Sequence, residues 1–378
     1  MTLEEKLVLV NQRPAGFDYM RLILATLVVL THSVAVGQGL AAHLAFWGGP
    51  IRPIHALVLP MFFALSGFLV AGSIERCRTL ISFIGLRVLR ILPALLVETT
   101  LSAMILGVYF TKFSYSAYFE DPSFRSYFLN ILGQVHFSLP GVYLSNPMPG
   151  LVNGQLWTLP FELKCYAILA VLAAISVVHR PKLFVPLVLL ANIAIVVRTD
   201  FFHLEPRFVY VNGKVLIFDF IYGLALFLNR TRVPWSGSLA VVSSIAALGC
   251  LAVPGLDYIS TLPVSYLTVY LGLLNPRRIK VLLAGDYSYG IFLYGYPIQQ
   301  AVVAILGGMM WWENMLLAFP VVVAFAAFSW WVIEKPALSL RKRLMALEDR
   351  ALSFFGGVVG GHLILRHTGI PATAARPD

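Results

Sequence analysis

The sequence predicts an all-α membrane protein with about ten transmembrane helices and both termini in the cytoplasm. First, 59% of the 378 residues are hydrophobic and only 12% are charged, whereas soluble domains carry roughly 25% charged residues. Second, the chain contains ten apolar runs, several of them near the roughly 20 residues that a helix needs to cross the hydrocarbon core. Third, lysine and arginine alternate between successive connecting segments, as the positive-inside rule requires.

The apolar runs define the expected domain organisation. In order, the ten expected spans are 17–36, 51–73, 88–110, 159–178, 183–198, 208–228, 238–253, 256–274, 281–304 and 314–334. Of these, 183–198 and 238–253 are short. We expect residues 1–343 to form one transmembrane domain and residues 344–378 to form a cytoplasmic tail. Its apolar part, 351–365, is too short to span and has the length of an interfacial segment.

The basic residues test this topology independently. If the N-terminus is cytoplasmic, ten spans place 20 of the 28 lysines and arginines on the inside. These are Lys6, Arg13, Arg76, Arg78, Arg87, Arg90, Arg180, Lys182, Arg230, Arg232, Arg277, Arg278, Lys280, Lys335, Arg341, Lys342, Arg343, Arg350, Arg366 and Arg376. The formal net charge of +10 would also suit a nucleic-acid binder, but the basic residues form short clusters between apolar spans. Membrane topology therefore explains them better.

The first span holds two polar side chains that are unusual in an apolar run. Arg21 and His32 are eleven residues apart, which on a helix places them on the same face and roughly 16 Å apart. Charged groups inside a span are costly, so such a pair indicates a functional site. The alternatives are that Arg21 is an anchor that snorkels to the interface and that His32 is a packed polar residue. A cleaved signal peptide is disfavoured, because an arginine interrupts the run and nine further spans follow.

Other polar residues near the membrane suggest binding and catalysis. Arg87 and Arg90 share a helical face, and guanidinium groups suit phosphate, although positive-inside anchoring explains them too. Glu162 begins the fourth span after a long loop, 111–158, rich in Gly, Pro and Asn. We expect Glu162 to face the same cavity as His32 and to orient its imidazole; the alternative is a simple boundary residue.

Further candidates are less specific. We expect Trp157 and Asn153, at the end of the same loop, to contact a substrate. Glu98 and Asp219 are intramembrane acids whose partners the sequence does not identify. The cysteines Cys77, Cys165 and Cys250 show neither metal-binding nor redox spacing, so the sequence predicts no disulfide framework and no metal site.

Together, six motifs in this order resemble the acyltransferase 3 family of integral membrane O-acyltransferases that modify cell-surface glycans. The resemblance covers about residues 13 to 343, and each motif is weak alone. The motifs are Arg21-x10-His32, FFALSGF at 62–68, the RxxR of Arg87 and Arg90, WTLPFE at 157–162, DYSYGIFLYGYP at 286–297 and IEKP at 333–336.

The resemblance implies an enzyme of the bacterial inner membrane. It would transfer an acyl group, most often acetyl from acetyl-CoA, to a hydroxyl of an extracytoplasmic or lipid-linked saccharide such as exopolysaccharide or O-antigen. His32 matches the family's essential histidine, Arg21 its paired basic residue, Arg87 and Arg90 the basic pair, and Glu162 the acid after the tryptophan. The implied partners are membrane lipid, acetyl-CoA and the saccharide acceptor, without metal or nucleic acid.

The sequence departs from the family at Tyr296, where many members have a histidine before the proline. We also expect no hydrolase-like domain of the kind that many relatives append after the last span. We therefore assign no catalytic role to the ninth span. An acyl-enzyme on His32 or Cys165 stays open. Two rival functions are a secondary transporter, which would favour internal repeats and broken helices, and a non-catalytic partner of a glycan assembly system.

Overall fold

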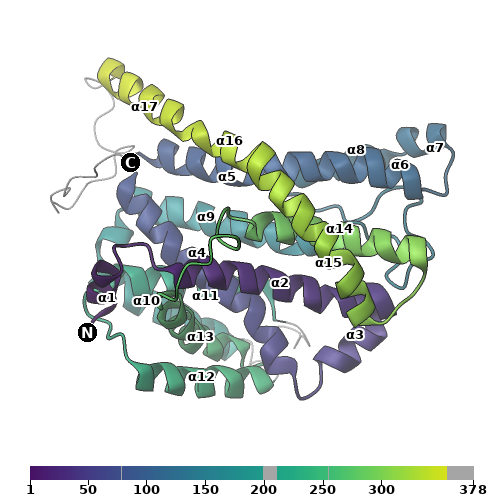
Figure 1. The fold of residues 1–378 in the computed structure, drawn as a ribbon. Coiled ribbons are helices and arrows are strands. Elements are labelled where there is room, and N and C mark those ends of the chain that lie inside the picture. Colours follow the sequence, from purple (N-terminus) through teal and green to yellow (C-terminus); the bar gives the residue numbers. More distant parts are fainter. Residues whose placement is uncertain (78, 199–210, 254, 356–378) are drawn as a thin grey trace.

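The computed structural model describes residues 1–77, 79–198, 211–253 and 255–355, and every regular element in these ranges is helical (Figure 1). The α-helices are α1 (Leu3–Leu9), α2 (Ala15–Gln38), α3 (Leu40–Trp47), α4 (Arg52–Arg76), α5 (Leu80–Leu101), α6 (Gly107–Phe110), α7 (Tyr115–Glu120), α8 (Pro122–Tyr127), α9 (Leu159–Ala174), α10 (Pro181–Val196), α11 (Gly213–Leu228), α12 (Gly237–Ala252), α13 (Asp257–Gly272), α14 (Ser288–Leu306), α15 (Trp311–Phe328), α16 (Lys335–Ser339) and α17 (Arg341–Phe355). Short π-helical or 3₁₀ turns join several of them: η1 (Ser102–Leu106), η2 (Phe128–Leu132), η3 (Gly154–Thr158), η4 (Val177–His179) and η6 (Ser329–Glu334).

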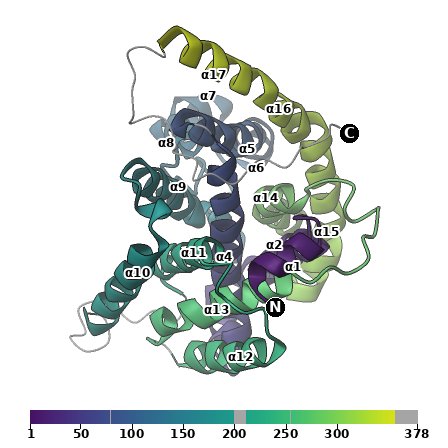
Figure 2. The ribbon, with the colours of Figure 1, turned by 90° about the vertical axis from the view of Figure 1, so that its left-hand side faces the viewer.

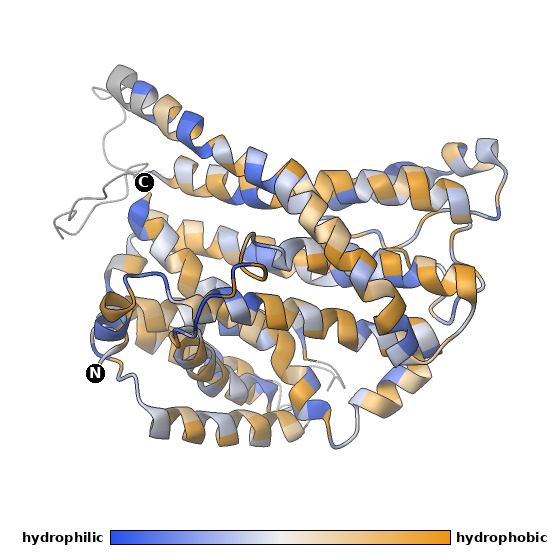
Figure 3. Ribbon diagram, viewed as in Figure 1, coloured by the Kyte–Doolittle hydropathy of each residue, from blue (hydrophilic) through white to orange (hydrophobic). Residues whose placement is uncertain are grey.

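The all-helical class is confirmed for the described residues, and this part of the chain contains several candidate membrane spans. Six helical stretches are long and apolar enough to cross a bilayer: Ala15–Gln38, Arg52–Arg76, Leu80–Phe110, Gly154–Ala174, Ser288–Leu306 and Trp311–Glu348. In Figure 3, hydrophobic colour runs along most of these helices, whereas hydrophilic residues are mixed into α17.

The other four expected spans coincide with α10, α11, α12 and α13, each of 16 residues. A helix of that length extends about 24 Å, which is less than the roughly 30 Å hydrocarbon core. The count of ten spans and the cytoplasmic side of both termini therefore stay predictions.

Helix α2 carries both Arg21 and His32 and lies inside the bundle. It packs against α3, α4, α13, α14 and α15, and it crosses the middle of the molecule in Figure 1. In Figure 2, α5 and α17 lie at one edge of the bundle and α12 lies at the opposite edge, with α4 between them. The site residues on α2 are therefore surrounded by helices from both halves of the chain.

Close helix contact holds α4 against α11. A Cβ atom added at Gly67 would lie 1.9 Å from the carbonyl oxygen of Phe220, and one added at Gly223 would lie 2.1 Å from that of Ala64. Only glycine permits such an approach of two backbones.

The first part of the expected tail is helical. Helix α17 begins at Arg341 and packs against α5, where Thr79 Oγ1 donates a hydrogen bond of 2.5 Å to Glu348. The remainder of the tail, 356–378, lies outside the described residues, as do Arg78 and the first three positions of the expected span 208–228.

Candidate active site

Two cavities lie beside α2, the helix that carries Arg21 and His32. One cavity, of about 570 Å³, is lined by Arg21, and we call it the arginine cavity. The other, of about 430 Å³, is lined by His32, and we call it the histidine cavity. Arg21 and His32, which the sequence predicts on one face of one helix, therefore line two different cavities.

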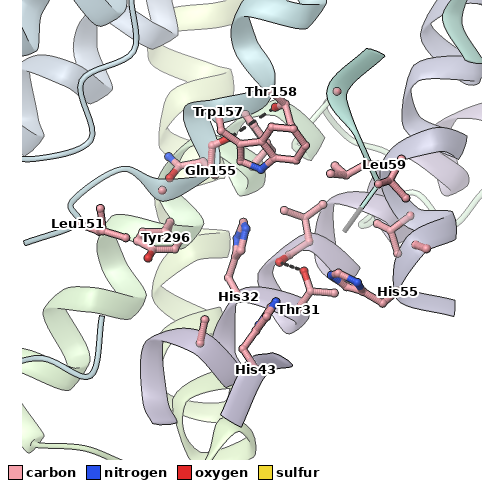
Figure 4. A pocket seen from close by; sticks show the side chains of 18 of the residues that line it. Thr31, His32, His43, His55, Leu59, Leu151, Gln155, Trp157, Thr158 and Tyr296 are labelled. Carbon is pink, nitrogen blue, oxygen red and sulfur yellow. Dashed lines mark hydrogen bonds between the residues drawn. The ribbon is translucent and has the colours of Figure 1, made fainter. Parts of the chain in front are cut away.

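His32 and Tyr296 meet in the histidine cavity. Their ring centroids are 5.2 Å apart with an interplanar angle of 80°, so the two rings pack edge to face. Figure 4 shows the imidazole of His32 pointing into the cavity below Trp157, which also lines it. Trp157 thus has the position expected of a substrate contact. The imidazole accepts and donates no hydrogen bond within the described part of the chain.

Two further histidines line the same cavity, and our reading of the sequence missed them. His43 comes from α3 and His55 from α4, and their ring centroids are 5.6 Å apart. The ring of His55 also stacks on Trp47 at 5.1 Å. A usable signal was present, because three of the eight histidines fall between positions 32 and 55. No group of three or more His, Cys, Asp or Glu side chains in the described ranges is arranged to hold a metal ion.

The arginine cavity brings the predicted phosphate ligands together. Arg21, Arg87 and Arg90 all line it, and so do Arg76 and Arg341, which the sequence did not single out. Against these five arginines, the acidic residues of the lining are Glu162 and Asp286. The excess of positive charge and the guanidinium donors suit an anion that carries phosphate groups.

Two acidic residues orient part of this cluster. Asp286 bridges two guanidinium groups, at 2.6 Å from Arg21 and 2.7 Å from Arg90. Glu334 binds Arg90 from the other side at 2.9 Å. Glu334 ends the π-helical turn η6 and also accepts a hydrogen bond of 2.9 Å from the hydroxyl of Ser329. Arg21 and Arg90 are therefore held in fixed positions before any ligand arrives.

The structure places Asp286 in the connection before α14, outside the membrane-crossing helix that begins at Ser288. Burial by itself would raise the pKa of this carboxyl group, but the guanidinium groups of Arg21 and Arg90 outweigh burial and lower its pKa to about 2. Asp286 is therefore a carboxylate at neutral pH.

Arg87 is the least engaged of the three predicted arginines. It donates one hydrogen bond of 3.1 Å to the hydroxyl of Ser73, and its Nε is buried with no hydrogen-bond partner in the described residues. Its guanidinium group lies 5.9 Å from the ring centroid of Tyr166. Arg87 therefore lines the cavity, and no ion pair with the described residues compensates its charge.

Glu162 differs from the expectation. It lines the arginine cavity and accepts a hydrogen bond of 2.6 Å from the hydroxyl of Tyr166, and the expected contact with His32 is absent from the described residues. Trp157 and Glu162 are five positions apart along η3 and α9, which on a helix is a rotation of about 140°. The two side chains of this motif therefore face different cavities.

Asn153 also lies elsewhere than expected, because it lines neither cavity. It is fully buried, donates a hydrogen bond of 3.2 Å to Glu98 and is bonded to the hydroxyl of Tyr127. Glu98 additionally accepts a hydrogen bond of 2.6 Å from Ser102. This network gives Glu98 its partners and ties the loop 111–158 to α5.

Two remaining candidates lie off both cavities. Cys165 is completely buried and lines neither of them. Asp219 is also completely buried, and neither of its carboxylate oxygens has a hydrogen-bond partner among the described residues.

Comparison with known proteins identifies the family of the chain. The acyltransferase 3 family model, described as an acyltransferase domain, matches residues 15–334. A protein named O-acetyl transferase from Shigella phage Sf6 is 27% identical over 344 residues, covering 88% of this chain and 98% of that protein. Nodulation protein 10 from Rhizobium leguminosarum bv. viciae is 29% identical over 374 residues, covering 89% of this chain and 97% of that protein. No solved structure matches. The chain belongs to the acyltransferase 3 family and is a membrane acyltransferase.

Proposed function

We propose that the protein transfers an acetyl group from acetyl-CoA to a hydroxyl of an extracytoplasmic or lipid-linked saccharide in the bacterial inner membrane. The observation that carries this proposal is the pair of adjoining cavities on one helix, one rich in arginine and the other in histidine. The name of the Shigella phage Sf6 relative, an O-acetyl transferase, favours acetyl as the acyl group.

The arginine cavity would bind the donor. Coenzyme A carries phosphate groups at one end and the thioester at the end of a slender arm. Arg87, which lines this cavity and makes no ion pair with the described residues, would hold phosphate directly. Arg21 and Arg90 would contribute positive charge from positions fixed by Asp286. The arm would extend toward His32, roughly 16 Å away along α2 by helical rise.

The histidine cavity would bind the acceptor and carry out the chemistry. A sugar hydroxyl is a poor nucleophile at neutral pH, and a positioned base accelerates such a reaction about 10²–10⁴-fold. The imidazole of His32 would take the hydroxyl proton as the oxygen bonds to the thioester carbonyl carbon. The carbon–sulfur bond then breaks, the thiolate of coenzyme A leaves, and the proton on His32 returns to sulfur or solvent.

Packing, rather than a carboxylate, would orient His32 in this mechanism. The ring of Tyr296 packs edge to face on the imidazole, and Glu162 makes its hydrogen bond in the other cavity. An acyl-enzyme on Cys165 forms no part of this mechanism, because Cys165 lines neither cavity.

Complementation of a gene deletion tests the proposed function. A strain without the gene is complemented with the wild-type protein, with His32→Ala or with the control His136→Ala, a histidine of the exterior loop that lines neither cavity. The readout is base-labile acetate on the extracted surface polysaccharide, at matched protein levels. We expect the deletion and His32→Ala to lose acetate that wild type and His136→Ala restore. Unchanged acetate in the deletion strain would refute the proposed function.

A further inference from the structure

The two cavities adjoin at a small set of side chains from three different elements. Leu59 of α4, Thr158 at the end of η3 and Phe292 of α14 each line both cavities, and these three are the residues that the two linings share. Leu59 and Thr158 can be seen at one side of the histidine cavity in Figure 4. We call these three residues the junction.

The junction separates two chemically different environments. The phosphate-binding arginines lie on one side of it, and His32 lies on the other. If the donor binds as proposed above, its acyl group has to pass the junction to reach the imidazole. The side chains at this place would therefore meet the acyl group, and among the described residues these three alone line both cavities.

Two of the three junction side chains are apolar, and both pack against buried hydrophobic clusters. Leu59 and Phe292 both pack against the main hydrophobic core. Phe292 also packs against a second cluster that contains Leu293 and Tyr294. Thr158 is buried, with 6% of its surface exposed. Because interiors are close-packed and give way little, side chains held in this manner set a fixed width.

We propose that Leu59, Thr158 and Phe292 form an acyl-selecting constriction that passes a two-carbon acyl group and excludes longer chains. This inference rests on the proposed function and narrows its donor to a short-chain acyl thioester. One methylene group changes discrimination in an apolar pocket by about 10–200-fold. Two extra methylene groups, as in butyryl, should therefore be rejected strongly.

Substitutions that shorten the side chains of the junction test the proposed constriction. The chain also offers matched control positions. Leu59→Ala and Phe292→Leu widen the junction. Leu69→Ala and Phe62→Leu make the same chemical changes on α4, in side chains that pack against the same core but line the arginine cavity alone. Full-length protein is assayed in membrane vesicles of the complemented deletion strain, which contain its own acceptor. Acetyl-CoA, propionyl-CoA and butyryl-CoA serve as donors.

The readout is the ratio of kcat/KM for butyryl-CoA to that for acetyl-CoA, from thiol release above the level of His32→Ala vesicles. This ratio does not depend on how much of each variant is folded. We expect both widening variants to raise it about tenfold or more, and the two controls to stay within twofold of wild type.

Three results would overturn the proposed constriction: a wild-type enzyme that uses butyryl-CoA as well as acetyl-CoA, widening variants with an unchanged ratio, or widening variants that lose acetyl transfer without gaining a longer donor. In each of these cases wild-type acetyl transfer itself would leave the proposed function standing. Failure of the wild-type protein to transfer acetyl would refute the proposed function instead.

Discussion

At the scale of single residues, two acids from distant parts of the chain hold the guanidinium group of Arg90. Arg90 binds Asp286 across 196 positions and Glu334 across 244 positions of the chain. Asp286 and Glu334 belong to the motifs at 286–297 and 333–336. No rule of sequence spacing pairs either acid with Arg90, because the residues are so far apart in the chain. Local periodicity reports on one helix, whereas these ion pairs depend on how several helices pack.

Removing the Asp286 carboxylate should destabilise the fold in a pH-dependent way. The pKa of Asp286 is lowered to about 2 from its ordinary value near 3.8. A depressed pKa contributes stability that is present above the ordinary value and is lost as the pH falls toward about 2. We expect Asp286→Asn to lower stability by on the order of 1–2 kcal/mol at pH 7 and to match wild type near pH 2, as measured by thermal unfolding in detergent.

The exposed pair of Asp18 and Arg278, 3.0 Å apart, supplies the control for that measurement. Surface ion pairs contribute about 0–1 kcal/mol, so Asp18→Asn should have little effect at either pH. A difference between Asp286→Asn and wild type that is equally large at pH 7 and near pH 2 would contradict the ion-pair explanation.

Tyr296 lies closer to His32 than its place in the ninth expected span indicated. The sequence analysis gave the ninth span no catalytic role, but the Tyr296 ring packs on His32. We expect Tyr296→Phe to stay within about threefold of wild-type kcat, because the ring contact survives. Tyr296→Ala should lower kcat at least tenfold, because the imidazole loses its support. The assay is acetyl transfer at saturating acetyl-CoA, and a Phe variant as inactive as the Ala variant would show that the hydroxyl matters instead.

At the scale of elements, hydrophobic runs located the helices well and their ends less well. All ten expected spans coincide with helices. The third begins at Leu80 rather than 88 and continues through the π-helical turn η1 to Phe110. Hydropathy undervalues the first part of this helix, because Arg87 and Arg90 lower the local average although both point into a cavity. Arginines that face a cavity therefore conceal the start of this helix from a hydropathy average.

The close contact of α4 and α11 gives a stability prediction at this scale. Gly67→Ala places a methyl group 1.9 Å from the Phe220 carbonyl oxygen, so the two helices must separate. Overpacking of this kind costs about 1–3 kcal/mol, and we expect a clear fall in the thermal unfolding temperature. Gly249→Ala on α12 is the control, because no atom lies within 4 Å of the added methyl group. Equal stability of the two variants would contradict the packing role of Gly67.

At the scale of the whole molecule, the arrangement is two cavities whose linings share the junction residues Leu59, Thr158 and Phe292. The sequence predicted that Arg21 and His32 share one helix, and helical rise gave their separation. It did not predict two compartments, because each lining combines residues from distant segments, such as Arg21 with Arg341 and His32 with Tyr296. The same reason explains why Glu162 and Asn153 were assigned to the wrong surroundings. A motif fixes which residues are neighbours in sequence, but helix rotation and packing decide which cavity each side chain enters.

The central claim is that donor binding and proton transfer reside in separate cavities, and binding of labelled acetyl-CoA to Arg87→Gln and His32→Ala, measured beside transfer, tests it most directly. We expect Arg87→Gln to raise the Kd about tenfold, since a charge-assisted hydrogen bond contributes roughly 1.5–3 kcal/mol, and to keep transfer at saturating donor. His32→Ala should bind acetyl-CoA as wild type does and transfer nothing. Loss of binding in His32→Ala, or an unchanged Kd in Arg87→Gln, would contradict the account.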